Sequence, residues 1–340
     1  MSDKSGSYGK YGRLWALISS VMIAALFLSG CGQAQKSKVY RVGILSGLNF
    51  VADSADGFKA GMAELGYVEG ENIVYDVQVT DFDMEAYRTI LQKFVADDVD
   101  LIVSFPTEAT IEAKVATQGT DIPVVFTFAL VEGMGIVDSI REPGGNITGV
   151  RYPGPDFAVK RLEVLLKLVP DARTIWLPYQ RGYPIVPPQL EQLHTAAKSA
   201  GVTLVEFPAD NAADLQAELD ARVNSGDIGF DAILMTVEPL MVTPENYAVV
   251  AQFAYQHNIP FGGAYVPAGE LTNLFGVDVI SFNSAKQAAL LADKIFKGTP
   301  AGTIPVASAD SFLTVDYKVA QIFGLTVPEG LLKQADNIVR

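Results

Sequence analysis

Residues 100–128 read DLIVSFPTEATIEAKVATQGTDIPVVFTF, and this stretch decides the fold class. The apolar run Leu101–Val103 predicts a short strand buried on both faces, and Pro106 ends it. Thr107–Glu108 can open a helix, and residues 122–128 supply the next strand. A strand, a helix and a second strand in this order predict a right-handed βαβ unit with parallel strands.

The same alternation continues along most of the chain. Strand-like runs at residues 39–45 and 73–79 flank a helical pattern that starts near Asp53. After the Pro- and Gly-rich residues 152–155 the order begins again, with strands predicted at 175–177, 202–207, 232–237 and 259–261 and helices between them. We therefore predict an α/β fold with two similar lobes joined near residues 150–155.

The first 30 residues have the order of a secretory signal peptide. Three basic residues come first: Lys4, Lys10 and Arg13. The uncharged run 14–28 would cover about 22 Å as a helix, which is less than the ~30 Å hydrocarbon core of a bilayer. Leu-Ser-Gly-Cys at 28–31 resembles the bacterial lipobox, which implies lipidation of Cys31 and a lipidated tether over residues 31–38. We expect an exported protein anchored by lipid at the periplasmic or extracellular face; the alternative is an ordinary N-terminal helix with a buried cysteine.

Charge and cysteine content exclude several classes of partner. The chain carries a formal net charge of −14, and removal of residues 1–30 makes it −16, so we expect no nucleic-acid partner. Cys31 is the only cysteine, which excludes an intramolecular disulfide or a cysteine metal cluster. The acidic residues near 81–83 and 97–100 lack the spacing of a calcium loop. We expect no metal and no cofactor.

Four blocks of sequence carry a resemblance to a known family. They are residues 57–73 (GFKAGMAELGYVEGENI), 122–127 (IPVVFT), 143–150 (PGGNITGV) and 324–332 (GLTVPEGLL). From Val42 to the C-terminus the chain resembles the substrate-binding proteins of bacterial ABC importers, the family that includes binders of tryptophan and other aromatic amino acids.

The resemblance implies a type I periplasmic-binding-protein fold. It has two flavodoxin-like (Rossmann-like) lobes with parallel sheets, a hinge with three crossovers, and a small-molecule ligand in the cleft. On this pattern lobe 1 comprises residues 39–150 and about 278–300, and lobe 2 comprises 151–277 and about 305–340. The resemblance also implies a monomer with an ABC permease and ATPase as partners.

The carboxyl ends of the predicted strands supply the candidate ligand-binding residues, because open parallel sheets bind ligands at that edge. These residues are Ser46, Asn49, Ser104, Thr107, Glu108, Phe126, Thr127, Tyr179, Arg181, Tyr183, Glu238, Tyr265 and Asp278. The aromatic side chains among them, with Phe50, Phe105 and Phe128, can wall a flat apolar body, and the hydroxyls can donate hydrogen bonds. Arg181 can bind a carboxylate, and Glu108, Glu238 or Asp278 can take an amine.

Each of these roles has an ordinary structural alternative. A phenylalanine at a strand end can belong to the core, Glu108 can complement the dipole of its helix, and Arg181 can be solvated in its Pro-rich loop. The loops 129–132 and 179–184 depart from the pattern of many relatives, and both are expected at the cleft. The ligand class therefore stays open between an amino acid and an aromatic or apolar carboxylate.

No catalytic motif favours an enzyme. The chain has no HExxH, no GxSxG and no Walker loop, and its two histidines, His194 and His257, lie within predicted helices. We expect an extracytoplasmic substrate-binding lipoprotein that captures a small solute and delivers it to a permease. One alternative is a ligand-sensing lipoprotein that signals to a membrane receptor. The other is a secreted hydrolase, for which the sequence offers no convincing nucleophile and base.

Overall fold

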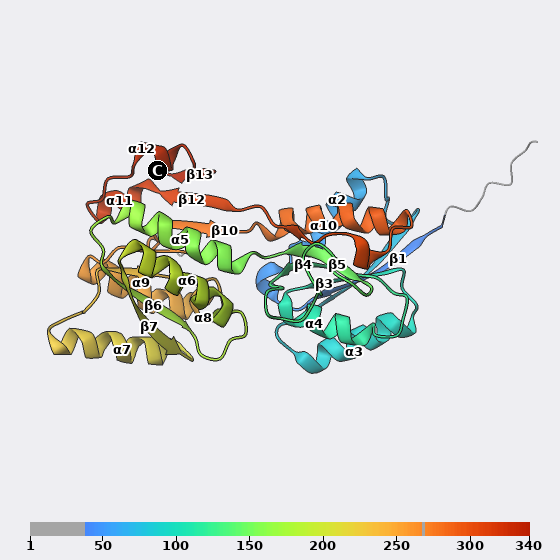
Figure 1. The fold of residues 1–340 in the computed structure, drawn as a ribbon, viewed down its shortest axis with the longest axis horizontal. Helices are drawn as coiled ribbons and strands as arrows, with labels where there is room; N and C mark the ends of the chain where they lie inside the picture. Colours follow the sequence, from blue (N-terminus) through green and yellow to red (C-terminus); the bar gives the residue numbers. More distant parts are fainter. Residues whose placement is uncertain (1–37, 267–268) are drawn as a thin grey trace, which may run out of the picture. The chain divides into compact units, whose positions relative to one another are not determined.

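The computed structural model describes residues 38–266 and 269–340 (Figure 1). The predicted signal peptide, Cys31 and nearly all of the tether lie outside the described residues, so the predictions made for them stay predictions. Within the described ranges, no helix combines the length and the apolar content that crossing a bilayer requires.

Lobe 1 is built on a six-stranded parallel sheet in the order β11-β5-β4-β3-β1-β2. Its strands are β1 (Tyr40–Ser46), β2 (Ile73–Val79), β3 (Leu101–Phe105), β4 (Val124–Ala129), β5 (Ile147–Arg151) and β11 (Ala307–Ser308). Its helices are η1 (Asn49–Val51), α2 (Ser54–Glu64), α3 (Met84–Ala96), α4 (Thr107–Ala116), α10 (Ser281–Phe296) and η2 (Ala301–Thr303). All five residues of β3 are buried, as expected for a strand covered on both faces.

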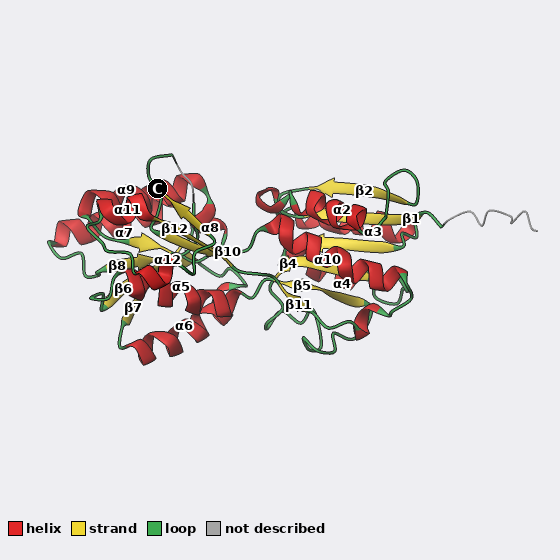
Figure 2. Cartoon of the chain, turned by 90° about the horizontal axis from the view of Figure 1, so that it is seen from above, coloured by secondary structure: helices red, strands yellow, loops and turns green. Residues whose placement is uncertain are grey.

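Helices cover both faces of the lobe 1 sheet (Figures 1 and 2). Helices α2 and α10 pack on one face around Phe58 and Met62, and α3 and α4 pack on the other around Tyr87 and Phe94. Helices α2 and α10 approach closely because Gly57 has no side chain; a Cβ there would lie 2.2 Å from the carbonyl oxygen of Phe282.

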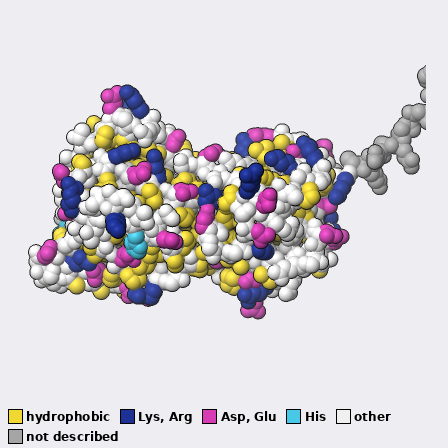
Figure 3. Space-filling model, in the orientation of Figure 1, with side chains coloured by type: hydrophobic (Ala, Val, Ile, Leu, Met, Phe, Trp, Pro, Cys, Tyr) yellow, Lys and Arg dark blue, Asp and Glu magenta, His cyan; other side chains and the backbone are white. Residues whose placement is uncertain are grey.

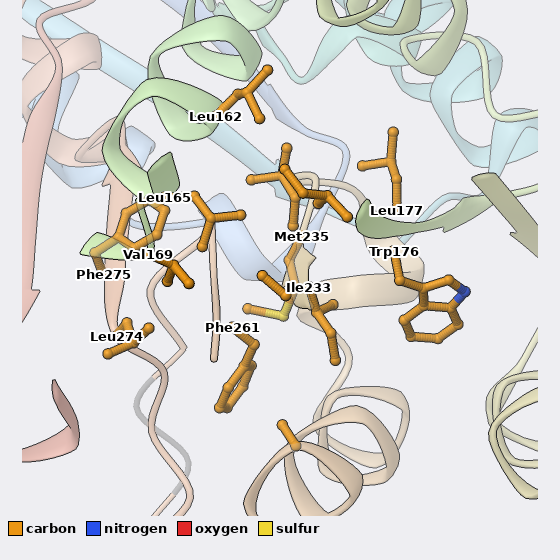
Figure 4. Packing of buried hydrophobic residues seen from close by; sticks show 14 of the residues in the cluster. Leu162, Leu165, Val169, Trp176, Leu177, Ile233, Met235, Phe261, Leu274 and Phe275 are labelled. Atoms are coloured by element: carbon orange, nitrogen blue, oxygen red, sulfur yellow. The ribbon is translucent and has the colours of Figure 1, made fainter. Parts of the chain in front are cut away.

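Lobe 2 contains a four-stranded parallel sheet in the order β7-β6-β8-β9. Its strands are β6 (Thr174–Gln180), β7 (Thr203–Ala209), β8 (Ala232–Leu234) and β9 (Phe261–Gly262). The helices are α5 (Gly154–Leu168), α6 (Val186–Ala200), α7 (Ala212–Ser225), α8 (Pro239–Val242) and α9 (Pro244–His257). Figure 4 shows the core of this lobe, which includes Trp176, Ile233 and Phe261 of the sheet and Leu162 and Leu165 of α5.

Three short strands and two short helices complete lobe 2. The strands β10 (Phe275–Asp278), β12 (Phe312–Asp316) and β13 (Asn337–Val339) form a sheet in which β10 and β12 are antiparallel. An isolated bridge between Gly263 and Gly276 connects this sheet to the end of β9. Helices α11 (Tyr317–Ile322) and α12 (Glu329–Leu332) lie in the same tail.

The chain passes between the lobes three times. The crossovers follow β5, β10 and β11, at residues 152–153, 279–280 and 309–311. The expected boundary near residue 305 differs from the structure, because β11 pairs with β5 and so still belongs to lobe 1. A strand of two residues, Ala307–Ser308, is too short to leave an apolar pattern in the sequence.

Candidate functional site

Two neighbouring cavities are lined by residues of both lobes. The first has a volume of about 320 Å³. The second, of about 310 Å³, shares Phe50, Phe128, Tyr152, Val237 and Val242 with the first. We refer to the two cavities together as the cleft. Each cavity alone is at the lower end of the range of about 300–1,000 Å³ that is usual for small-molecule sites.

Loops at the carboxyl ends of strands build the cleft. Lobe 1 contributes Leu48, Asn49 and Phe50 after β1, Asp81 and Phe82 after β2, Pro106 and Thr107 after β3, and Phe128 at the end of β4. Lobe 2 contributes Tyr183, Ile185, Val237, Glu238, Pro239, Val242, Thr243 and Pro244, and the second cavity adds Ala264, Tyr265, Val266, Asp278, Val279 and Thr314. The site therefore lies where parallel sheets are expected to bind ligands.

Aromatic rings from both lobes form the walls. Phe82 and Tyr183 meet edge to face, with ring centroids 6.4 Å apart and an interplanar angle of 81°. Phe128 lies 5.4 Å from Tyr152 of the first crossover, at an angle of 36°. Phe50 remains 58% exposed. Rings at these positions offer flat apolar area to a planar ligand.

Two of these wall residues have a strained backbone. Phe82 has φ = 53° and Phe128 has φ = 51°, in the left-handed region that bulky L-residues avoid. This conformation costs about 1–2 kcal/mol for each residue. Strained residues of this kind concentrate at functional sites, so the strain supports a binding role for the two rings.

Glu238 is buried and holds the start of α8. Its Oε2 accepts a hydrogen bond from the Leu240 N–H at 2.9 Å, and its Oε1 accepts from the Thr236 hydroxyl at 3.1 Å and the Gln180 N–H at 3.3 Å. Burial raises the pKa of Glu238 to about 7, although these hydrogen bonds act against the shift. A carboxyl group that titrates near neutral pH thus lines the cleft.

Tyr183 of lobe 2 lies close to Glu108 of lobe 1. Both carboxylate oxygens of Glu108 are buried, and neither has a hydrogen-bond partner of good geometry among the described residues. Burial raises the pKa of Glu108. Burial and then the nearby charge of Glu108 raise the pKa of Tyr183 well above its usual value. Tyr183 lines the cleft, whereas Glu108 lies behind it.

Asp278 and Tyr265 line the second cavity. Asp278 Oδ2 accepts a hydrogen bond from the Tyr265 N–H at 3.0 Å, and Asp278 Oδ1 lies 3.9 Å from Nη2 of the buried Arg161. Burial raises the pKa of Asp278, and the charge of Arg161 opposes this shift. The Tyr265 hydroxyl donates to Asp316 Oδ2 at 3.2 Å, and burial raises its pKa to about 12.

Four of the predicted site residues instead lie inside lobe 1. Phe126 is fully buried in the core beside α3 and α4. The Thr127 hydroxyl lies 2.8 Å from the Ser284 hydroxyl of α10, and the Ser104 hydroxyl donates to Thr110 Oγ1 at 3.2 Å. Ser46 is fully buried. None of these four lines the cleft.

Two further candidates lie on the surface of lobe 2. The Tyr179 hydroxyl donates to Glu206 at 3.0 Å. Arg181 is 56% exposed and binds Asp210 at 3.2 Å and the Pro208 carbonyl at 2.7 Å. Neither residue lines the cleft, so the structure does not bring Arg181 to a bound carboxylate.

The structure brings six of the predicted residues to the cleft: Asn49, Thr107, Tyr183, Glu238, Tyr265 and Asp278. The Thr107 hydroxyl accepts a hydrogen bond from the Leu130 N–H at 3.0 Å and keeps its O–H as a donor. The sequence reasoning missed Asp81, Phe82 and Tyr152. These three residues come just after β2 and β5, and their place at strand ends could have identified them, since loops at those strand ends face the cleft.

Among the described residues, no group of three His, Cys, Asp or Glu side chains could hold a metal ion.

Two α/β lobes, three crossovers and a cleft lined from both sides define a type I periplasmic-binding-protein fold. The chain belongs to the family of ABC transporter substrate binding proteins, whose family model matches residues 46–339. The family and the fold predicted from the sequence are therefore confirmed.

Individual relatives agree with this assignment. The tyrosine-binding protein of Clostridioides difficile (strain R20291) is 27% identical over 318 residues, which is 88% of each chain. An ABC domain from Streptococcus pneumonia, solved in complex with L-Trp, is 22% identical with a TM-score of 0.76, over 89% of this chain and 100% of that one. The ligand-free, open structure of a substrate binding protein from Clostridium difficile is 23% identical with a TM-score of 0.72, over 88% and 99%. The two structures support the fold.

Proposed function

We propose that this chain is a lipid-anchored, extracytoplasmic receptor that captures a small solute with a flat aromatic body and delivers it to an ABC permease. The observation that carries the proposal is the cleft, in which Phe50, Phe82 and Phe128 of lobe 1 face a cavity that Tyr183 of lobe 2 also lines. Tyrosine and tryptophan, the ligands named for two relatives, are aromatic solutes of this size class.

The strength of binding requires more than ring contacts. Burying about 150–250 Å² of aromatic surface yields about 4–6 kcal/mol at ~25 cal/mol per Å². Micromolar affinity needs about 8 kcal/mol after the costs of association. Polar groups of the cleft must therefore contribute, and Asp81, Glu238 and Asp278 are the charged groups in its lining.

Closure of the lobes would let both sets of walls contact one ligand. The three crossovers are two or three residues long, which suits a hinge between two rigid bodies. A ligand that contacts both lobes would favour the closed form through those contacts, and the closed surface would be presented to the permease.

Export, anchoring and partners complete the proposal. The signal-like residues 1–30 and Cys31 support a lipoprotein. Membership of the substrate binding protein family supports a permease and an ATPase as partners, and we take the receptor to act as a monomer. The charge of −14 acts against a nucleic-acid partner. On the face drawn in Figure 3, Lys and Arg side chains are interspersed with Asp and Glu and form no basic patch.

Thermal unfolding of the mature protein with a panel of aromatic and non-aromatic solutes tests the proposal. We expect aromatic solutes to raise the melting temperature, and Phe50→Ala to reduce that rise. Leu290→Ala is the matched control, because Leu290 is 52% exposed on α10 and does not line the cleft. A rise with sugars or aliphatic solutes only would contradict the proposal, as would equal effects of the two substitutions.

A further inference from the structure

The charged side chains that line the cleft are all acidic. Among the described residues, Asp81, Glu238 and Asp278 line it, and no lysine, arginine or histidine does. Asp278 is balanced by Arg161, which lies behind it at 3.9 Å. Asp81 and Glu238 form no ion pair in the described part of the chain. The cleft therefore presents two carboxyl groups that accept hydrogen bonds but have no ion-pair partner, and it presents no side-chain cation to a ligand.

A ligand carboxylate can also bind to free N–H groups at the start of a helix, and several helices begin at the cleft. At α4, Glu108 places a carboxylate in the first turn. At α6, Pro187 and Pro188 remove donors from the first turn. At α8, Glu238 accepts from the Leu240 N–H.

The last of these helices, α9, starts with Pro244 and has Glu245 in its first turn. Helices α4, α6, α8 and α9 are thus supplied with an acidic side chain, with proline, or with both. Helices η1 and α10 have neither in the first turn, but each has a carboxylate from another segment at its start. The Asn49 N–H of η1 donates to Asp81 Oδ1 at 3.2 Å, and the Ser281 hydroxyl of α10 donates to Asp53 Oδ1 at 2.5 Å. A ligand carboxylate at any of these helix starts would therefore meet a protein carboxylate or lack a backbone N–H donor.

Two arginines of lobe 2 that could be considered for a ligand carboxylate are already occupied. Arg181 binds Asp210 and the Pro208 carbonyl on the surface. Arg161 is 1% exposed and donates to the Val277 and Gly263 carbonyl oxygens and to the Tyr152 hydroxyl. Neither guanidinium lines the cleft, so neither is placed to bind a ligand carboxylate.

We propose that the cleft takes aromatic solutes that carry a protonated amine and no carboxylate, the arylalkylamine class, in preference to zwitterionic aromatic amino acids. This inference rests on the proposed function, since it takes the cleft as the ligand site and the rings as its walls. The ring of the ligand lies against Phe82 and Phe128, and its ammonium group faces Asp81 and Glu238.

The titration of Glu238 gives an additional readout. Burial raises its pKa to about 7, so the group is partly protonated in the empty cleft near neutral pH. A cation beside it favours the charged form and lowers the pKa. Binding of an amine should therefore release protons, and the amount released should change with the ionisation state of Glu238.

Isothermal titration calorimetry at pH 7 with three related ligands tests the inference. Tyramine carries an amine only, L-tyrosine carries both groups, and 3-(4-hydroxyphenyl)propionate carries a carboxylate only. We expect tyramine to bind at least tenfold more tightly than L-tyrosine, and the propionate to bind most weakly. Titration of tyramine in buffers of different ionisation enthalpy should show proton release.

Two variants with the same change in net charge assign the effect to the cleft. Asp81→Asn should weaken tyramine at least threefold and leave a neutral analogue, 4-ethylphenol, unchanged. Asp121→Asn is the control, because Asp121 is exposed and lies outside the cleft lining. Equal effects of the two substitutions on tyramine would overturn the assignment of the carboxyl groups.

The outcomes separate the two proposals. If L-tyrosine or the propionate binds more tightly than tyramine, the inference on ligand charge is wrong, while the aromatic receptor remains. If none of the three ligands and no neutral aromatic solute binds, the proposed function itself fails.

Discussion

Replacing Arg161 by methionine should strongly destabilise lobe 2 and the crossovers. The guanidinium is 1% exposed, and its Nε and Nη2 donate to the Val277 carbonyl at 3.0 and 2.6 Å. It also donates to the Gly263 carbonyl at 3.2 Å and the Tyr152 hydroxyl at 2.9 Å. Arg161 therefore joins α5 to the end of β9, to β10 and to the first crossover.

The expected loss of unfolding free energy arises because the substitution leaves Asp278 without its charged partner. Removing one partner of a buried ion pair costs about 3–5 kcal/mol. The side chain of Asp278 is 28% exposed and 3.9 Å away, which argues for the lower end, about 3 kcal/mol. Arg181→Met is the matched control, because Arg181 and Asp210 are 56% and 57% exposed, and such surface pairs contribute about 0–1 kcal/mol.

Urea unfolding, followed by circular dichroism, measures the difference. Arg161→Met should lower the unfolding midpoint clearly, and Arg161→Lys should fall between, since lysine keeps the charge and loses the planar fork. If Arg161→Met and Arg181→Met lower the midpoint equally, the buried guanidinium does not organise the crossovers in the way described.

Three further predictions concern stability and anchoring. The pKa of Glu238 is about 7 in the folded protein and has an ordinary value of 4.5. The protonated group therefore stabilises the fold fully below about pH 4.5, and this stabilisation, about 3 kcal/mol, is lost as the pH rises through 7. Glu238→Gln should flatten this part of a melting-temperature curve from pH 4 to 8, and parallel curves for the two proteins would refute it. Gly57→Ala should lower the free energy of unfolding in urea by about 1–3 kcal/mol, because α2 and α10 must separate. A Cβ at Gly330 meets no atom within 4 Å, so Gly330→Ala should be close to neutral. Equal unfolding midpoints for the two variants would count against the close helix contact. Labelling of cells with radioactive palmitate should mark the wild-type chain and not Cys31→Ser, and equal labelling would exclude Cys31 as the lipid site.

The fold was predictable where strands are buried on both faces. Runs such as residues 101–105 and 124–129 leave an apolar pattern that needs no knowledge of the partner strands. The pairing of β11 with β5 was not predictable, because two residues carry no periodicity. The antiparallel pair β10 and β12 depends on segments separated by the whole of α10, which a local pattern does not encode.

The candidate site was predictable as a region and less so as a set of side chains. Thr127 stands at a strand end as expected, but its hydroxyl faces Ser284 of α10, since alternate residues of a strand face opposite sides of the sheet. Phe82 was missed because its partner in the cleft, Tyr183, comes from the other lobe. Arg181 forms an ion pair with Asp210, which directly follows β7, and the sequence alone does not show this contact.

Native mass spectrometry of the mature protein with tyramine and with L-tyrosine tests the central claim most directly. Wild-type protein should carry one molecule of an aromatic solute and release it chemically unchanged. Val242→Trp should carry none, because Val242 lines both cavities and a larger ring there fills the cleft. Equal binding by the two proteins, or release of an altered solute, would contradict the claim that the cleft captures the solute and passes it on intact.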